Sequence, residues 1–186
     1  MKYLLSLIFV VLFFSSCANK ISQPYIDSSS LCTQKIASLY IDNITIENKN
    51  SNLIVRKEDV LNIFESSLKD SGCYHIYNHT DGKQLLMEDT YLLNLRVIIA
   101  QENETIKDSF ITKDKEEKQI ALFILSAYNG KNSITVKSRS ELLTSYTKII
   151  GIDTQDEFNQ DKKKLLEGAS KKAILDLTSM IQKANY

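Results

Sequence analysis

The sequence is poor in the residues that break regular structure, with one proline and five glycines in 186 residues. Collagen-like and proline-rich linker architectures are therefore excluded. The chain also lacks an excess of either charge, since 23 basic residues stand against 23 acidic ones. This balance disfavours a nucleic-acid binder that works through the phosphate backbone. Hydrophobic residues at 43% and charged residues at 25% are instead typical of an ordinary globular domain.

Residues that commonly act in catalysis or bind metal ions are also scarce, with two histidines and three cysteines. The two histidines, His75 and His79, lie four residues apart in or beside a short expected strand, whereas a hydrolytic triad needs a nucleophile next to a base. Their positions do not have the ligand spacing of a zinc site, and no glycine-rich phosphate loop or calcium loop is present. We therefore expect no enzymatic activity, no catalytic residue, no metal and no cofactor.

The N-terminus has the pattern of an export signal. A short positive region with Lys2 precedes residues 4–14, which are apolar apart from Ser6. This span is too short to cross a bilayer of about 30 Å as a helix, so residues 1–16 are predicted to be a signal peptide. The residues up to Cys17 resemble the lipobox of bacterial lipoproteins, in which the cysteine is acylated and becomes the mature N-terminus. The alternatives are an ordinary secretory signal with an incidental cysteine and a buried hydrophobic first element.

The lipobox resemblance implies an anchor and a location. Two or three acyl chains on Cys17 would hold the protein stably at a membrane. By resemblance to lipoprotein sorting in diderm bacteria, Ala18 in place of an aspartate favours the outer membrane, with the domain facing the periplasm. The inner membrane and the cell surface stay open. Residues 17–31 are predicted to be a flexible tether that reaches about 40 Å, and residues 32–186 a single globular domain.

Two further cysteines, Cys32 and Cys73, would share an oxidising compartment after export. Cys32 precedes the first expected strand and Cys73 opens the second, so parallel neighbouring strands would bring both to the same end of the sheet. A disulfide between them would close a loop of about 41 residues and contribute roughly 4 kcal/mol in the chain-entropy model. Two unrelated buried thiols are the alternative, and the sequence does not decide between the two.

Hydrophobic periodicity predicts a β-α-β unit at the start of the domain. Residues 35–46 alternate as a strand. Apolar residues then recur at helical spacing over residues 57–71, and Gly72 ends the helix. Residues 73–78 follow at once as a second short strand.

A strand and a charged stretch come next. A short helical turn is expected over residues 81–89, followed by a long strand over residues 90–101. Residues 102–118 are rich in charge, and the alternating signs of residues 113–118 predict a solvated loop. An electrostatic docking edge for a partner is the alternative for this loop.

A hairpin and a helix complete the domain. Residues 119–128 are apolar on both faces and predict a central strand. Asn129 and Gly130 predict a type I′ turn, which needs positive φ at both positions, and residues 133–150 return as a strand. An amphipathic helix is expected over residues 156–183. Its buried stripe is predicted to contain Leu166, Ala169, Ala173, Leu177, Met180 and Ile181.

These elements predict an α/β (α+β) fold: a β-α-β unit, a strand, a long β-hairpin and a C-terminal helix packed on a mixed sheet. The order, together with the lipobox and the tether, resembles the CsgG/LpoB-type superfamily of envelope lipoproteins, whose domain is similar to the N-terminal domain of TolB. The stretches that match it are residues 35–37 with Asn43, residues 64–76, residues 89–93 and residues 128–131. A second resemblance is to LptE, a lipopolysaccharide-assembly lipoprotein that binds an outer-membrane β-barrel.

Both resemblances imply a binding or assembly role without catalysis. The first implies a module that activates a peptidoglycan synthase or serves a secretion or flagellar-ring machine, with an envelope protein as partner. The candidate partner-binding residues are Lys137, Arg139 and Lys148 on the returning strand, and an exposed sheet edge or the long hairpin would carry the contact. Assembly of the chain into a homo-oligomeric ring stays open.

Overall fold

The computed structural model describes residues 30–77, 89–108, 113–148 and 158–184. The described residues form β1 (Ala37–Lys49), α2 (Lys57–Ser71), β2 (Tyr74–Tyr77), β3 (Thr90–Asp108), β4 (Lys113–Tyr128), β5 (Ser133–Lys148) and α3 (Phe158–Ala184). The predicted signal peptide, Cys17, most of the tether and nearly all of the turn expected over residues 81–89 lie outside these ranges. None of the described helices is long and apolar enough to cross a membrane.

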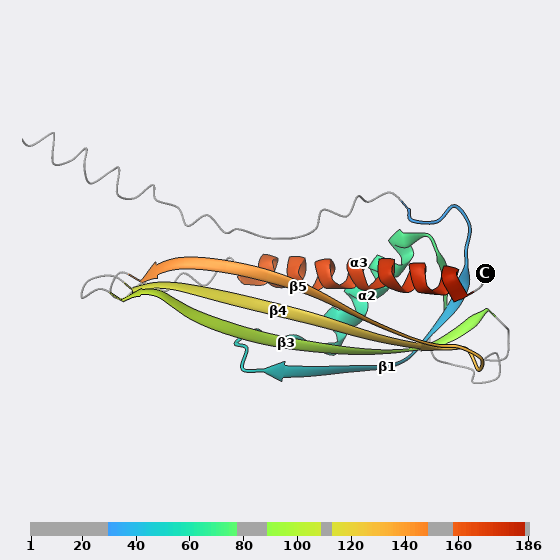
Figure 1. Ribbon diagram of the computed structural model, residues 1–186, viewed down its shortest axis with the longest axis horizontal. Helices are drawn as coiled ribbons and strands as arrows, with labels where there is room; N and C mark the ends of the chain where they lie inside the picture. Colours follow the sequence, from blue (N-terminus) through green and yellow to red (C-terminus); the bar gives the residue numbers. More distant parts are fainter. Residues whose placement is uncertain (1–29, 78–88, 109–112, 149–157, 185–186) are drawn as a thin grey trace, which may run out of the picture.

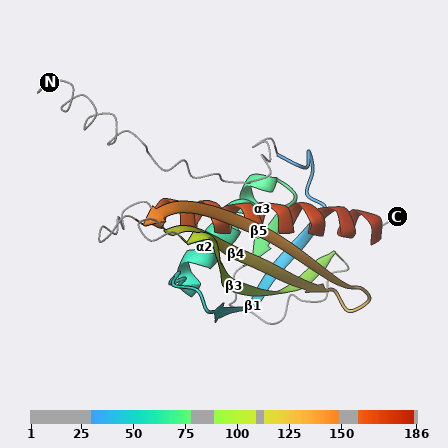
Figure 2. The ribbon, with the colours of Figure 1, turned by 60° about the vertical axis from the view of Figure 1, so that its left-hand side comes forward.

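The sheet is mixed, as predicted. Its five described strands have the order β2-β1-β3-β4-β5. β1 runs parallel to both β2 and β3, whereas β3, β4 and β5 are antiparallel neighbours. Both helices lie on one face of this sheet (Figures 1 and 2). The predicted fold class is therefore confirmed, including the β-α-β unit and the C-terminal helix.

The core lies between the sheet and the two helices. Alternate residues of β3, from Leu93 to Ile99, are at most 1% exposed, because every second side chain of a strand points to the same face. A bulge near Asp42 in β1 shifts this alternation, so that Ile41 and Ile44 both face the core. One extra residue thus keeps apolar side chains on the core face on both sides of the bulge, as far as Ile46.

Helix α2 ends where the sequence predicts. Gly72 adopts a left-handed conformation with φ of 72°, and its N–H donates to the carbonyl of Lys69 at 3.1 Å. A Cβ at this position would lie 3.1 Å from Cβ of Ser30 and 3.2 Å from the carbonyl oxygen of Cys32. Glycine is required here both for its backbone conformation and for the close approach of the chain that leads into β1.

The charged stretch after Gln101 corrects the sequence prediction. β3 continues to Asp108 and β4 begins at Lys113, and β5 pairs with this part of β4 as far as Lys148. The expected loop is therefore part of a three-stranded extension of the sheet. The register places Glu102 opposite Lys118, and it also pairs Lys107 with Asp114 and Asp108 with Lys113. Oppositely charged residues at these facing positions favour strand pairing, whereas Glu104 opposite Glu116 opposes it.

Two smaller predictions are also wrong. The hairpin is present, but Asn129 does not have positive φ, because four residues rather than two connect β4 to β5. The side-chain oxygen of Asn129 accepts the N–H groups of Lys131 at 3.1 Å and Asn132 at 2.7 Å, which closes the loop as an Asx-type turn. In α3, Met180 was expected in the buried stripe but is 43% exposed, since Leu177, Thr178 and Ile181 face the core instead.

Candidate partner-binding surface

The two described helices lie on one face of the sheet (Figure 2), and we call the opposite face the helix-free face. It carries an apolar strip along its middle strands. Ile98 of β3 lies opposite Leu122 of β4, and the next rows contain Ile120 and Ile124. These side chains are buried or half-buried although no described helix covers them. Long polar side chains on the neighbouring strands flank the strip and limit its exposure.

One rim of the strip is an ion pair between β1 and β3. Arg96 donates to both carboxylate oxygens of Glu47, from Nε at 2.7 Å and from Nη2 at 2.8 Å. This bidentate hydrogen bond lowers the pKa of Glu47 below its ordinary value. Both side chains are exposed, so the ion pair is expected to contribute little to the free energy of unfolding. It holds the two charged groups side by side along this rim.

The other rim lies on β4 and β5 and is positively charged. Glu141 accepts Nζ of Lys118 at 2.8 Å and Nε of Arg139 at 2.6 Å. Lys137 precedes Arg139 on the same face, is exposed and forms no ion pair with any residue that the structure describes. The four side chains therefore leave an excess of positive charge along the edge of the sheet.

The structure brings together two of the three predicted partner-binding residues. Lys137 and Arg139 both lie on the helix-free face of β5. Lys148 ends the same strand and is paired in register with Lys113. At about 3.3 Å per residue, Lys148 is roughly 30 Å from Arg139, so it does not belong to the same patch.

β5 is an edge strand held from one side only. Its core-facing side chains lie under α3, where the hydroxyl of Ser138 donates to Oδ2 of Asp176 at 2.8 Å. On the outer side no described strand pairs with β5. An edge supported in this way offers backbone groups to an added strand, and lysine on such an edge suppresses unspecific pairing.

A buried polar cluster marks the point where the helix-covered core ends. Gln119, only 2% exposed, accepts a hydrogen bond from Oγ of Ser51 at 2.8 Å. Its amide nitrogen donates to Gln101 at 2.9 Å and to Glu117 at 2.6 Å. Sequence analysis missed this cluster, although a glutamine that begins an apolar strand is a signal that could have indicated it. On the far side of this cluster from the helix-covered core, β3, β4 and β5 continue as the charged extension of the sheet.

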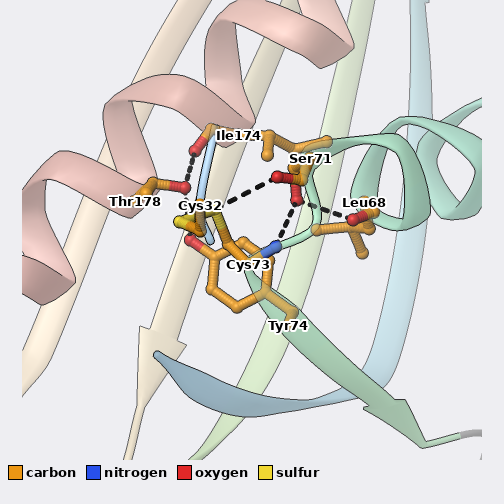
Figure 3. Close-up of a disulfide and its surroundings, with 7 residues drawn as sticks. All are labelled: Cys32, Leu68, Ser71, Cys73, Tyr74, Ile174 and Thr178. Carbon is orange, nitrogen blue, oxygen red and sulfur yellow. Dashed lines mark hydrogen bonds between the residues drawn. A yellow bond between two sulfur atoms is a disulfide. The ribbon is translucent and has the colours of Figure 1, made fainter. Parts of the chain in front are cut away.

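The opposite end of the sheet is tied by the two cysteines. Cys32 and Cys73, whose pairing the sequence left open, form a disulfide with a Cα–Cα distance of 5.0 Å (Figure 3). The N–H groups of Leu31 and Cys32 donate to the carbonyl of Ser71 at 2.8 and 3.3 Å. The hydroxyl of Ser71 donates to the carbonyl of Leu68 at 2.6 Å and accepts the N–H of Cys73 at 3.2 Å.

The same end is fastened to α3 by a buried hydrogen bond. The hydroxyl of Thr178 donates to the carbonyl of Ile174 at 2.8 Å, so the hydroxyl of Tyr74 donates to Thr178 at 2.7 Å (Figure 3). Burial raises the pKa of Tyr74 above its ordinary value. The disulfide and these hydrogen bonds therefore tie α2, β2 and α3 together as one base at this end of the sheet.

The described part of the chain contains no cluster of metal-ligating side chains. Within this part, no group of three or more His, Cys, Asp or Glu side chains is placed to hold a metal ion. His75 is exposed on the helix-free face of β2, whereas His79 lies outside the described residues. The helix-free face instead offers charged side chains, an apolar strip and the backbone hydrogen-bonding groups of β5.

No protein-family model matches the sequence, and no curated protein matches it. Solved structures do have similar folds. A protein described as a neuraminyllactose-binding hemagglutinin homolog from Helicobacter pylori is 15% identical, with a TM-score of 0.43 and coverage of 86% of this chain and 90% of that chain.

Two further similar structures are bacterial lipoproteins. A minor lipoprotein from Acinetobacter baumannii is 14% identical, with a TM-score of 0.39 and coverage of 81% of this chain and 95% of that chain. Rare lipoprotein B from Shewanella oneidensis is 10% identical, with a TM-score of 0.40 and coverage of 78% of this chain and 100% of that chain. This likeness concerns the fold alone, so the CsgG/LpoB-type and LptE-type resemblances stay predictions.

Proposed function

We propose that this protein is a lipid-anchored, non-enzymatic binding module of the bacterial cell envelope. In this proposal Cys17 is acylated in the outer membrane, and the domain recruits or positions an envelope protein in the periplasm. The observation that carries the proposal is the helix-free face, where an apolar strip lies between two charged rims beside the open edge of β5. The export signal and the tether supply the anchor.

The chemistry of the surface defines the kind of partner. Lys137 and Arg139 would attract an acidic surface and orient it, because complementary charge raises the rate of encounter and fixes register. The unpaired edge of β5 would then accept a strand of the partner, while the apolar strip around Ile98 and Leu122 buries its side chains. A peptidoglycan synthase, a secretion component or a flagellar-ring component with such an acidic strand is the partner class that we propose.

The test is charge reversal on the rim. A C-terminally tagged chain with Lys137→Glu and Arg139→Glu is expressed in place of the wild type, crosslinked in intact cells and purified with its partners. We expect loss of the crosslinked partner, while a matched Lys172→Glu variant on the exposed surface of α3 keeps it. Equal capture by all three proteins would remove the β5 rim as the binding site.

The anchor is tested separately on the same material. Mass spectrometry of the N-terminal peptide should show an acylated Cys17 as the first residue of the mature chain. A mature chain that begins elsewhere, without acyl groups, would contradict the lipoprotein assignment. If only copies of the chain itself are crosslinked, the binding-module proposal is replaced by a homo-oligomeric ring.

A further inference from the structure

One end of the sheet gathers exposed apolar side chains. We call it the proximal end and define it by residues 30–36, the start of β3 at Thr90, the β4–β5 turn over residues 129–132 and the C-terminus of α3 (Figure 1). Six large hydrophobic side chains among the described residues are exposed, and Leu31, Tyr77, Tyr128 and Met180 are the four at or near this end.

Two of these residues, Tyr77 and Tyr128, belong to one row across the sheet. The register links Tyr77 to Tyr40, Tyr40 to Leu92 and Leu92 to Tyr128. Tyr77 is 46% exposed and Tyr128 is 52% exposed. Both lie on the helix-free face: Tyr128 ends β4 beside the turn into β5, and Tyr77 ends β2 at the opposite edge of the sheet.

The remaining two residues lie on the helix side of the same end. Leu31, 40% exposed, is held by its N–H bond to Ser71, and Met180, 43% exposed, lies in the last turns of α3. The exposed apolar groups therefore surround the end of the sheet. At Gly130, in the adjoining turn, no atom other than those of its chain neighbours lies within 4 Å of the position of a Cβ, so this side of the turn faces open space.

We infer that the proximal end rests on the lipid surface in which the anchor lies, with Tyr77 and Tyr128 in the interfacial region. This inference depends on the proposed acylation of Cys17. The described chain begins at Ser30 at this end, thirteen residues after Cys17, which can span at most about 45 Å. Tyrosine suits this position because its ring is apolar and its hydroxyl is polar.

At the opposite end, Ile54 is the large exposed hydrophobic residue among those whose side chains the structure describes. Ile54, 79% exposed, is held near the start of α3 by the bond from Nζ of Lys162 to its carbonyl at 3.1 Å. Lys162 and Met180 are eighteen residues apart on α3, about 27 Å along the helix axis. In the inferred orientation the lipid contacts the proximal end, and the charged extension of β3 and β4 points away from the membrane.

Single tryptophans test the orientation directly, because the chain contains none. Tyr77→Trp, Tyr128→Trp and the control Ile54→Trp are made in the full-length chain, and the mature proteins are reconstituted into vesicles of phosphatidylethanolamine and phosphatidylglycerol. Emission is compared between ordinary vesicles and vesicles whose acyl chains are brominated. We expect a blue shift and quenching at positions 77 and 128, and neither effect at position 54.

Each outcome has one meaning. Quenching at positions 77 and 128 that persists in high salt supports a lipid contact made by apolar groups rather than by charge. Co-flotation of all three variants with the vesicles, without quenching at positions 77 and 128, overturns the orientation and leaves the anchor intact. Failure of the wild type to co-float overturns both the orientation and the proposed acylation. Matching thermal unfolding of the variants and the wild type excludes misfolding as the cause.

Discussion

The two ends of the sheet are built on different physical principles. At the proximal end a disulfide, two helices and a buried tyrosine hydroxyl fix the chain within a few residues of its first described position. At the other end β3, β4 and β5 continue past the row of Gln101 and Gln119 as a charged extension, which we call the arm (residues 102–108, 113–118 and 143–148). Figure 1 shows these strands extending past the start of α3.

The difference shows that one sheet can combine an apolar, covalently cross-linked end with a charged end that no described helix covers. Apolar burial and a covalent bond maintain the proximal end independently of any partner. The arm has cross-strand charge pairs in register, such as Glu102 with Lys118, but no described helix covers it. Its stability should therefore be lower than that of the base and should depend on salt.

The largest effect is expected from removal of the disulfide. The double variant Cys32→Ala and Cys73→Ala should lose about 4 kcal/mol of unfolding free energy, since the bond closes a long loop in the unfolded chain. Chemical denaturation measures this loss, and a reducing agent should reproduce it in the wild type but not in the variant. A loss below about 1 kcal/mol would show that the proximal end does not depend on the disulfide.

The boundary between core and arm should be the next most sensitive point. Gln119→Ala removes three partly buried hydrogen bonds and leaves the hydroxyl of Ser51 without its acceptor, so we expect a loss of about 1 to 3 kcal/mol. Asn94→Ala, on the exposed helix-free face, serves as the control and should be near neutral. Equal stability of the two variants would mean that the cluster is a surface feature.

A smaller effect is expected where α2 and α3 both begin. Nζ of Lys162 lies 3.1 Å from Oδ2 of Asp59, and this hydrogen bond holds the pKa of Asp59 below its ordinary value of 3.8. Asp59→Asn should therefore cost about 0.5 kcal/mol at neutral pH.

The pH dependence of that loss checks its cause. Because the folded-state pKa of Asp59 is lowered, its contribution is present above pH 3.8 and is lost as the pH falls through the folded-state pKa. The unfolding free energies of variant and wild type should therefore converge in acid. A difference that stays constant across this pH range would show that the carboxylate charge is not responsible.

The smallest effect on stability is expected from the binding rim. Lys137→Glu with Arg139→Glu should change the unfolding free energy by no more than about 0.5 kcal/mol, since both side chains are exposed. Thermal unfolding of the variant measures this change. A large loss would mean that the rim maintains the fold, and the capture experiment would then have to use milder substitutions such as Lys137→Ala.

The regular parts of the fold could be predicted because each depends on local pattern. Helix α2 was placed at the residues where it occurs, since its apolar spacing and Gly72 define both the buried face and the end. The parallel placement of β1 and β2 followed from the β-α-β order. β1 begins two residues later than expected. It ends three residues later than expected, because the bulge near Asp42 interrupts the alternation that would have indicated a longer strand.

The remaining features depend on partners that are distant in the sequence. Residues 113–118 have the composition of a loop, and only the facing residues of β3 and β5 make them a strand. Lys137 and Arg139 could be assigned to one face from their spacing, whereas the link from Glu141 to Lys118 required the register. The cluster around Gln119 joins β4 to Ser51, sixty-eight residues away, and no local pattern reports such a contact.

The central claim is that the helix-free face beside β5 binds an envelope protein. The most direct test places a photo-crosslinking amino acid at Thr135, which is exposed on this face, and at Lys172 on the exposed surface of α3. After irradiation of intact cells, the account predicts a discrete heterologous crosslinked product from position 135 and none from position 172. Crosslinks from position 172 alone, or from neither position, would contradict it.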